Sequence, residues 1–281
     1  MAELTALECG TPSRSDCPAG DAGRFSDKSA YGDFSNGIGH SLALIGLERA
    51  TSTGPSVASV TFLIGQQCDD GGFPEVFNAA TCTSSVDTTG FAAQALLLAG
   101  PAAAAAAQDA IAFLKSVQNT DGSFTGNGSD NSNTTALAAQ ALTAAGESAA
   151  AASARQFIAS LQSGCSASAP NRGKIAYDAA GGGDDLRAST QAVPALAGVP
   201  LGQITSEGAA AEAPTLACVV APGPSTRPGS PTAPGTGSGT GADVGVLANT
   251  GAGPGPAVAG GVLLIIGVGL VLLGRRRSLP S

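Results

Sequence analysis

The sequence predicts an all-α protein built from repeated helix pairs, followed by a linker and a C-terminal transmembrane helix. A motif of Phe, an aliphatic residue, three variable positions and Gln occurs three times, with its glutamines 51 and then 44 residues apart. Such a period is typical of repeat proteins, and the Ala-rich segments beside the motif favour helices. Near the C-terminus an uncharged apolar run ends at three arginines, as expected for a membrane span.

The repeated motif marks the first helix of each pair. It lies at residues 62–67, 113–118 and 157–162. The first two copies are followed by Asp-Gly-x-Phe, and Gly173-Lys174-Ile175 takes that place in the third. Because Asp-Gly ends a helix, each motif predicts the end of a helix. These helices carry the more polar residues, which indicates an outer layer.

The second helix of each pair is predicted to start at an Asp or Asn. Nearly identical stretches, Asp-Thr-Thr and Asn-Thr-Thr followed by Ala-rich sequence, begin at Asp87 and Asn133, and a third copy begins at Asp185. A side-chain oxygen at these positions can accept a bond from the free amides of a helix start. The small, apolar composition predicts inner helices packed between neighbours.

A partial unit precedes the three complete ones. Residues 23–25 match 71–73, and residues 37–42 match 90–95 when shifted by 53 positions. The chain is therefore expected to begin inside a repeat, with residues 1–25 as the end of an outer helix and its loop. About three and a half pairs are present, and we expect an upstream extension to encode an export signal and further pairs.

These motifs resemble a known superfamily. The pattern F-L-x-x-x-Q-x-x-D-G-[GS]-F at 62–73 and 113–124 is similar to the repeat of prenyltransferases and squalene cyclases. The inner-helix pattern also resembles the cobalamin carriers, intrinsic factor and transcobalamin. The resemblance covers residues 20–200 and implies an α/α toroid, here the N-terminally incomplete domain 1–218. It is specific to the fold and not to an activity.

Catalysis is not expected from the residues present. The Asp pairs at 69–70 and 184–185 lack the first acid of the cyclase motif DxDD. The single histidine, His40, is expected to be packed on an inner helix, so no metal site or cofactor is predicted. We expect a domain that binds a ligand or partner. The alternatives are a terpene-cyclase or prenyltransferase-like enzyme whose catalytic residues lie upstream, and a purely structural surface protein.

The candidate ligand site is the polar start of the inner helices. Five residues should lie on a common rim there: Asp87, Thr88, Asn133, Thr134 and Asp185. Each could simply cap its own helix. Together, facing small residues, they could hold a polar or anionic group of a small or medium-sized molecule.

The cysteines and the net charge indicate an exported protein that does not bind nucleic acid. The net charge of −8 disfavours a phosphate backbone as a partner. Six cysteines indicate up to three disulfides outside the cell, with fifteen possible pairings. Cys9 with Cys17 and Cys68 with Cys82 would each close a short loop, which leaves Cys165 with Cys218.

The C-terminal 35 residues resemble an actinobacterial cell-wall sorting signal. Residues 219–246 form a Pro/Gly/Ser/Thr-rich linker, which cannot bury a core. The motif of the LAxTG type within residues 247–281 is Leu247, Ala248, Asn249, Thr250 and Gly251. An apolar span at 256–274 and three arginines follow. The resemblance implies that a class E-like sortase cleaves between Thr250 and Gly251 and joins the protein to peptidoglycan, in an extracellular, wall-anchored location.

Overall fold

The computed structural model describes residues 2–11, 14, 16–181, 185–207 and 218. The linker at 219–246, the sorting motif and the span at 256–274 lie outside the described residues. Among the residues that are described, no helix is both long and apolar enough to cross a bilayer.

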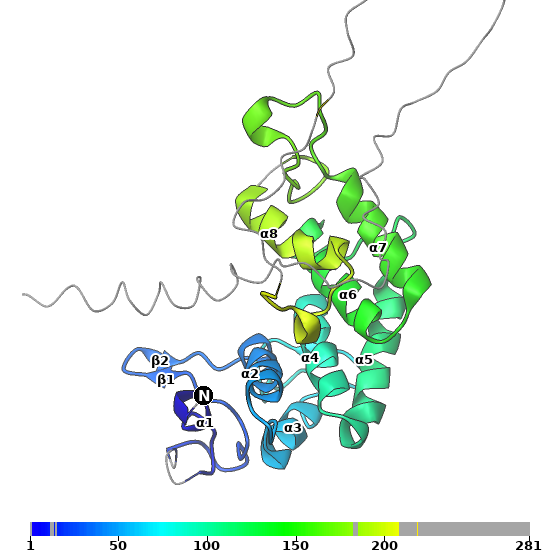
Figure 1. Cartoon of the computed structure of the whole chain (residues 1–281). Helices are drawn as coiled ribbons and strands as arrows, with labels where there is room; N and C mark the ends of the chain where they lie inside the picture. The colour runs from blue at the N-terminus through cyan, green and yellow to red at the C-terminus, as the bar shows by residue number, and fades with distance from the viewer. Residues whose placement is uncertain (1, 12–13, 15, 182–184, 208–217, 219–281) are drawn as a thin grey trace, which may run out of the picture.

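Two layers of helices make up the described part (Figure 1). The inner helices are α2 (Gly37–Ala50), α4 (Val86–Leu98), α6 (Ser132–Ala144) and α8 (Asp185–Leu196). The outer helices are α3 (Val57–Ile64), α5 (Ala104–Val117) and α7 (Ser148–Ser160). Each inner helix packs against the next one along the chain and against an outer helix. The predicted array of helix pairs, with the repeated motif at the end of each outer helix, is confirmed.

Short elements complete the chain. They are α1 (Ala2–Thr5) and the 3-10 turns η1 (Pro101–Ala103), η2 (Ala169–Asn171) and η3 (Leu201–Gln203). Three antiparallel hairpins of two-residue strands were not predicted: β1 (Lys28–Ser29) with β2 (Gly32–Asp33), β3 (Phe73–Pro74) with β4 (Ser84–Ser85), and β5 (Thr125–Gly126) with β6 (Ser129–Asp130). The three hairpins lead into α2, α4 and α6, so these three inner helices begin at the same end.

Small side chains let the helices approach closely. Alanine is the commonest buried residue of α4 and α6, and Leu96 and Leu142 are fully enclosed. The phenylalanines after the outer helices, Phe73 and Phe124, are also fully buried. Gly90 shows why small residues are needed, since a Cβ there would lie 3.0 Å from the Leu137 carbonyl carbon of α6.

The repeated Gln and Gly form the joint between units. The Gln118 side-chain amide donates to the carbonyl of Gly122 in its own loop and to that of Ala150 in the next outer helix. Gln67 does the same with Gly71 and Ala106. Gly71 and Gly122 both have positive φ, and a Cβ on either would collide with the backbone of the next outer helix. The repeat motif therefore encodes packing.

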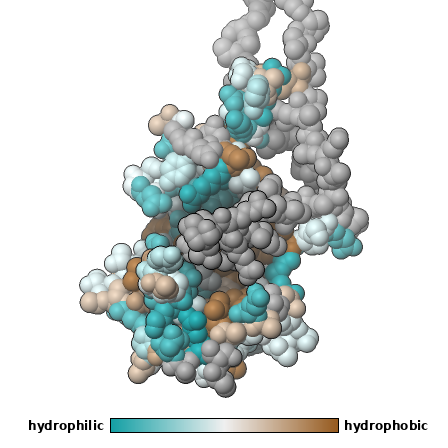
Figure 2. All heavy atoms as spheres, turned by 90° about the vertical axis from the view of Figure 1, so that its left-hand side faces the viewer, coloured by the Kyte–Doolittle hydropathy of each residue, from teal (hydrophilic) through white to brown (hydrophobic). Residues whose placement is uncertain are grey.

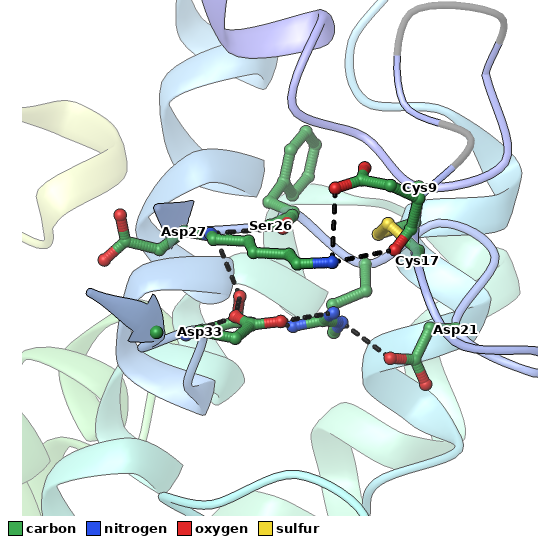
Figure 3. Close-up of polar contacts among 12 residues, drawn as sticks. Cys9, Cys17, Asp21, Ser26, Asp27 and Asp33 are labelled. Carbon is green, nitrogen blue, oxygen red and sulfur yellow. Dashed lines mark hydrogen bonds and ion pairs between the residues drawn. A yellow bond between two sulfur atoms is a disulfide. The ribbon is translucent and has the colours of Figure 1, made fainter. Parts of the chain in front are cut away.

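Disulfides join the three predicted pairs of cysteines: Cys9–Cys17, Cys68–Cys82 and Cys165–Cys218. The first lies in a polar N-terminal segment, residues 2–36 (Figure 3). There the buried Arg24 guanidinium pairs with Asp21 at 2.8 Å and with Asp33 at 2.9 Å. The hydrogen bonds from Arg24 hold the pKa of Asp33 well below its usual range. This segment covers the first helix pair with a closed network of charges.

Candidate functional site

One hydrogen bond recurs at the start of every inner helix. The backbone N–H that follows each outer helix and its loop donates to a side chain in the first turns of the inner helix. Phe73 donates to Thr89 Oγ1 at 2.8 Å, and Phe124 to Thr135 Oγ1 at 3.0 Å. Phe25 donates to His40 Nδ1, and Ile175 to Ser189 Oγ. These bonds make His40, Thr89, Thr135 and Ser189 equivalent positions.

The same equivalence corrects the alignment of the first unit. His40 corresponds to Thr89, a shift of 49 residues, whereas the sequence comparison used 53. The error is one helical turn. It arose because the sequence of α2, rich in Gly and aliphatic residues, lacks the Asp-Thr-Thr motif and matches the later helices in either alignment.

The helix caps also lie two residues earlier than predicted. Ser85 caps α4 by accepting from the Thr88 backbone N–H, and Asn131 caps α6 by accepting from the Thr134 N–H. Asp87 and Asn133 lie inside the first turn. Their side chains are therefore not needed as caps, and the simplest structural explanation for them is removed.

The rim residues contain buried polar atoms without partners. Among the described residues, no hydrogen bond reaches Asp87 Oδ1, Thr88 Oγ1, Asn133 Oδ1 or Thr134 Oγ1. Thr88 and Thr134 are at most 1% exposed, so water has almost no access to their hydroxyls. Asp185 begins α8, and its side chain is outside the described part. Leaving a polar group buried and unpaired costs about 1–3 kcal/mol.

Other unpartnered atoms lie on the same helices. Nine buried side-chain polar atoms lack a hydrogen bond among the described residues, and two of them, Arg14 Nε and Arg24 Nε, are in ion pairs. The remaining seven are all in α4, α6 and α8; besides the four rim atoms they are Ser132 Oγ, Gln140 Oε1 and Gln191 Oε1. The rim prediction did not include these three residues. The motif Ala-Ala-Gln-Ala-Leu, which contains Gln140, was the signal available in the sequence.

A chain segment on the inner helices shows where this glutamine position points. Residues 201–204, here called the strap, return to α2 and α4 (Figure 1). The Leu201 N–H donates to Gln94 Oε1 at 2.9 Å, and Arg49 donates to the carbonyls of Leu201 and Ile204. The strap therefore defines an inner face, the side of the inner helices that turns away from the outer ones. Figure 2 views the molecule from the left of Figure 1 and shows brown hydrophobic atoms among teal hydrophilic ones.

Gln94 and Gln140 are equivalent and differ in their partners. Both donate from Nε2 to the carbonyl four residues earlier, at Gly90 and Ala136. That shared bond turns both Oε1 atoms in the same direction. Gln94 Oε1 accepts from the Leu201 N–H of the strap. Gln140 Oε1, in a side chain that is 2% exposed, has no hydrogen-bond partner among the described residues.

His40 is a packing residue. Its ring is 1% exposed and lies 5.2–5.8 Å from the rings of Phe25, Phe62 and Phe77. Nε2 is 2.9 Å from the Ser59 carbonyl, and Nδ1 accepts from Phe25. Since a carbonyl only accepts, Nε2 carries the proton and the ring is neutral. Burial lowers its pKa to about 4.

Two pockets lie away from the inner face. One, of about 420 Å³, lies between α3 and α5 beside Asp69, Asp70 and Asp109. The other, of about 520 Å³, is lined by the β3–β4 loop and α5. Asp70 accepts from the Gly72 N–H and the Ser84 hydroxyl, so part of this acidic cluster serves its loop. Within the described ranges no three His, Cys, Asp or Glu side chains form a metal-binding group.

Comparison with known proteins identifies the fold. The family model of the prenyltransferase alpha-alpha toroid domain matches residues 38–170 and 66–199. Together the two matches span more than half of the 281-residue chain. No curated protein matches the chain.

Proposed function

Since this chain belongs to the prenyltransferase alpha-alpha toroid family, we propose that it is a wall-anchored surface protein whose toroid domain binds a ligand or partner without catalysis. The observation that carries the binding role is the set of seven unpartnered polar atoms on α4, α6 and α8. Polar groups that serve only the fold are normally paired when buried. Atoms left open on three adjacent helices are expected where a second molecule completes the bonding.

The wall attachment rests on the order of three sequence features. LANTG at 247–251 precedes the apolar span at 256–274, and three arginines follow it. This order would leave the toroid domain outside the membrane, on the linker 219–246. Three disulfides in the described part are typical of a protein in an oxidising compartment. A class E-like sortase and peptidoglycan are the partners that the motif implies.

A double substitution tests the attachment. Thr250→Ala with Gly251→Ala replaces the residues on both sides of the bond that a sortase would cleave and keeps the apolar span. We expect the variant in the membrane fraction and the parent covalently linked to peptidoglycan. Lysozyme digestion of the wall fraction followed by immunoblotting measures the linked protein. Equal linkage of both proteins to peptidoglycan would reject the sorting role.

The ligand role is tested on the inner face. Asp87→Ser and Asn133→Ser shorten two rim side chains while the caps Ser85 and Asn131 stay in place. A screen of the parent should include corrinoids and isoprenoids. The double variant should bind any ligand found in this way more weakly than the parent does, and its melting temperature should be unchanged. If no ligand is found, or the variant binds as well, a structural surface module is the better description.

The second candidate is a prenyltransferase-like or cyclase-like enzyme, which the family match favours. In this alternative the catalytic residues are expected in sequence upstream of residue 1. His40 is held in packing by its bonds to Ser59 and Phe25. Turnover of isoprenyl diphosphates or squalene by the chain together with any upstream segment would establish the enzyme. The absence of turnover alongside ligand binding would favour the non-catalytic role.

A further inference from the structure

The seven unpartnered atoms of the inner helices share one chemical property among the described residues. Four of the seven can only accept hydrogen bonds: a carboxylate oxygen of Asp87 and the amide oxygens of Asn133, Gln140 and Gln191. The other three are hydroxyls, which can accept as well as donate. A molecule that completes this set must supply N–H or O–H donors.

The register places these acceptors on one face. Counted from the equivalent pair Thr89 and Thr135, Asp87 of α4 and Asn133 of α6 occupy matching positions. Gln140 lies two turns further along α6, at the position where Gln94 of α4 meets the strap. Ser189 of α8 is equivalent to Thr135 of α6, so Gln191, two residues later, occupies the position of Leu137. Adjacent helices lie about 8–10 Å apart, so one ligand with several donors can reach more than one of these acceptors.

The strap shows that this face accepts donors. At Gln94 the position is filled by a backbone N–H, from Leu201. The equivalent Gln140 oxygen is buried and has no hydrogen-bond partner among the described residues. An anion does not fit this set, because the amides of Thr88 and Thr134 already donate to Ser85 and Asn131. A fully apolar molecule would leave the acceptors unpaired.

We infer that the inner face of α4, α6 and α8 binds a molecule that carries a protonated amine and several hydroxyl or amide donors. The ammonium group would pair with Asp87, and the neutral donors would bond to Asn133 and Gln140. Phe91 follows Asp87 by one turn and is half-buried, so it offers an apolar ring beside the ammonium. Arg187, the matching residue of α8, is separated from Asp87 by α6. This inference rests on the proposed binding role and specifies its ligand.

Three sugars of one ring type provide the test. Glucosamine carries an ammonium group, glucose a hydroxyl and glucuronate a carboxylate. Calorimetric titration of the full-length chain in mild detergent should show glucosamine binding about ten- to a hundred-fold more tightly than glucose, as expected for a charged hydrogen bond. Glucuronate should bind more weakly than glucose.

Matched variants localise the effect. Asp87→Asn should remove the preference for glucosamine over glucose. Gln140→Leu should lower the affinity for both sugars at an unchanged melting temperature. Asp109→Asn, an exposed acid on the outer helix α5, is the control and should leave the preference intact. The inference is overturned if glucosamine does not bind, if glucuronate binds as tightly, or if Asp87→Asn keeps the preference. If Asn133→Ser then lowers the affinity for a corrinoid or an isoprenoid, the binding site on the inner face is still supported.

Discussion

The N-terminal segment and the inner helices differ in whether their buried polar groups have partners. In residues 2–36 the buried Arg24 is paired with two carboxylates, and Asp21 also accepts from Asn78. In α4 and α6, polar atoms of Asp87, Asn133 and Gln140 have no hydrogen-bond partner in the part of the chain that the structure describes. A closed network specifies one arrangement of the chain, whereas buried polar atoms without partners lower its stability until something binds them. Substitutions in the two regions should therefore have different costs.

Breaking the closed network should have the largest effect. Arg24→Met removes the cation and leaves Asp21 buried without a counter-charge. We expect the free energy of unfolding in urea to fall by about 3–5 kcal/mol. Lys115→Met, which breaks an exposed pair with Glu147, is the control and should cost at most about 1 kcal/mol. Similar losses for both variants would contradict the distinction.

Acid should weaken the first unit through His40. Its pKa is about 4 when folded and near 6.5 when unfolded, so the folded state resists protonation. The stability that the neutral ring provides is complete above pH 6.5 and is lost as pH falls towards 4. Between pH 7 and pH 5 the loss should be about 2 kcal/mol.

His40→Gln supplies the comparison for that measurement. It removes the titrating group, so the free energy of unfolding should change less between pH 7 and pH 5 than in the parent. Equal pH dependence of the two proteins would show that the ring is accessible to protons in the folded state. Chemical denaturation at each pH gives the required values.

The two glutamines offer a direct comparison of a paired and an unpaired residue. Gln94→Leu removes the acceptor of the Leu201 N–H and should cost about 1–2 kcal/mol. Amide hydrogen exchange at Leu201 should become faster as the strap loosens. A wild-type exchange rate in this variant would mean that Arg49 alone holds the strap.

The smallest effect is expected at Gln140. Gln140→Leu removes an oxygen that has no partner among the described residues, together with one bond to Ala136. The two changes nearly cancel, so the melting temperature should stay within about 2 °C of the parent, which corresponds to less than about 1 kcal/mol. A loss as large as that of Gln94→Leu would show that Gln140 has a structural role.

Features that depend on residues close together in the sequence could be predicted. The repeated Phe and Gln marked the outer helices, and the loop lengths between cysteines favoured the pairing that the structure has. The two-residue strands are too short for any alternation to appear in sequence. The cap at Ser85 could not be separated from Asp87, because both residue types favour helix starts.

Features that depend on distant contacts could not be predicted. The strap is fixed by Arg49 and Gln94, each more than 100 residues before Leu201. Nothing local in residues 201–204 indicates where they bind. The difference between Gln94 and Gln140 is equally invisible, since both lie in the same Ala-Ala-Gln-Ala-Leu sequence. The sorting motif and span lie outside the described residues and remain predictions.

The joint between units has a consequence for how such a chain can lengthen. Gln118 and Gly122 supply one half of a joint, and the backbone of Ala150 and Ser153 supplies the other half. Because the receiving half is backbone, it makes little demand on the sequence of the next unit. An in-frame tandem duplication of one complete unit would therefore bring both halves with it. The number of helix pairs can then change by recombination without new contacts having to arise by point mutation.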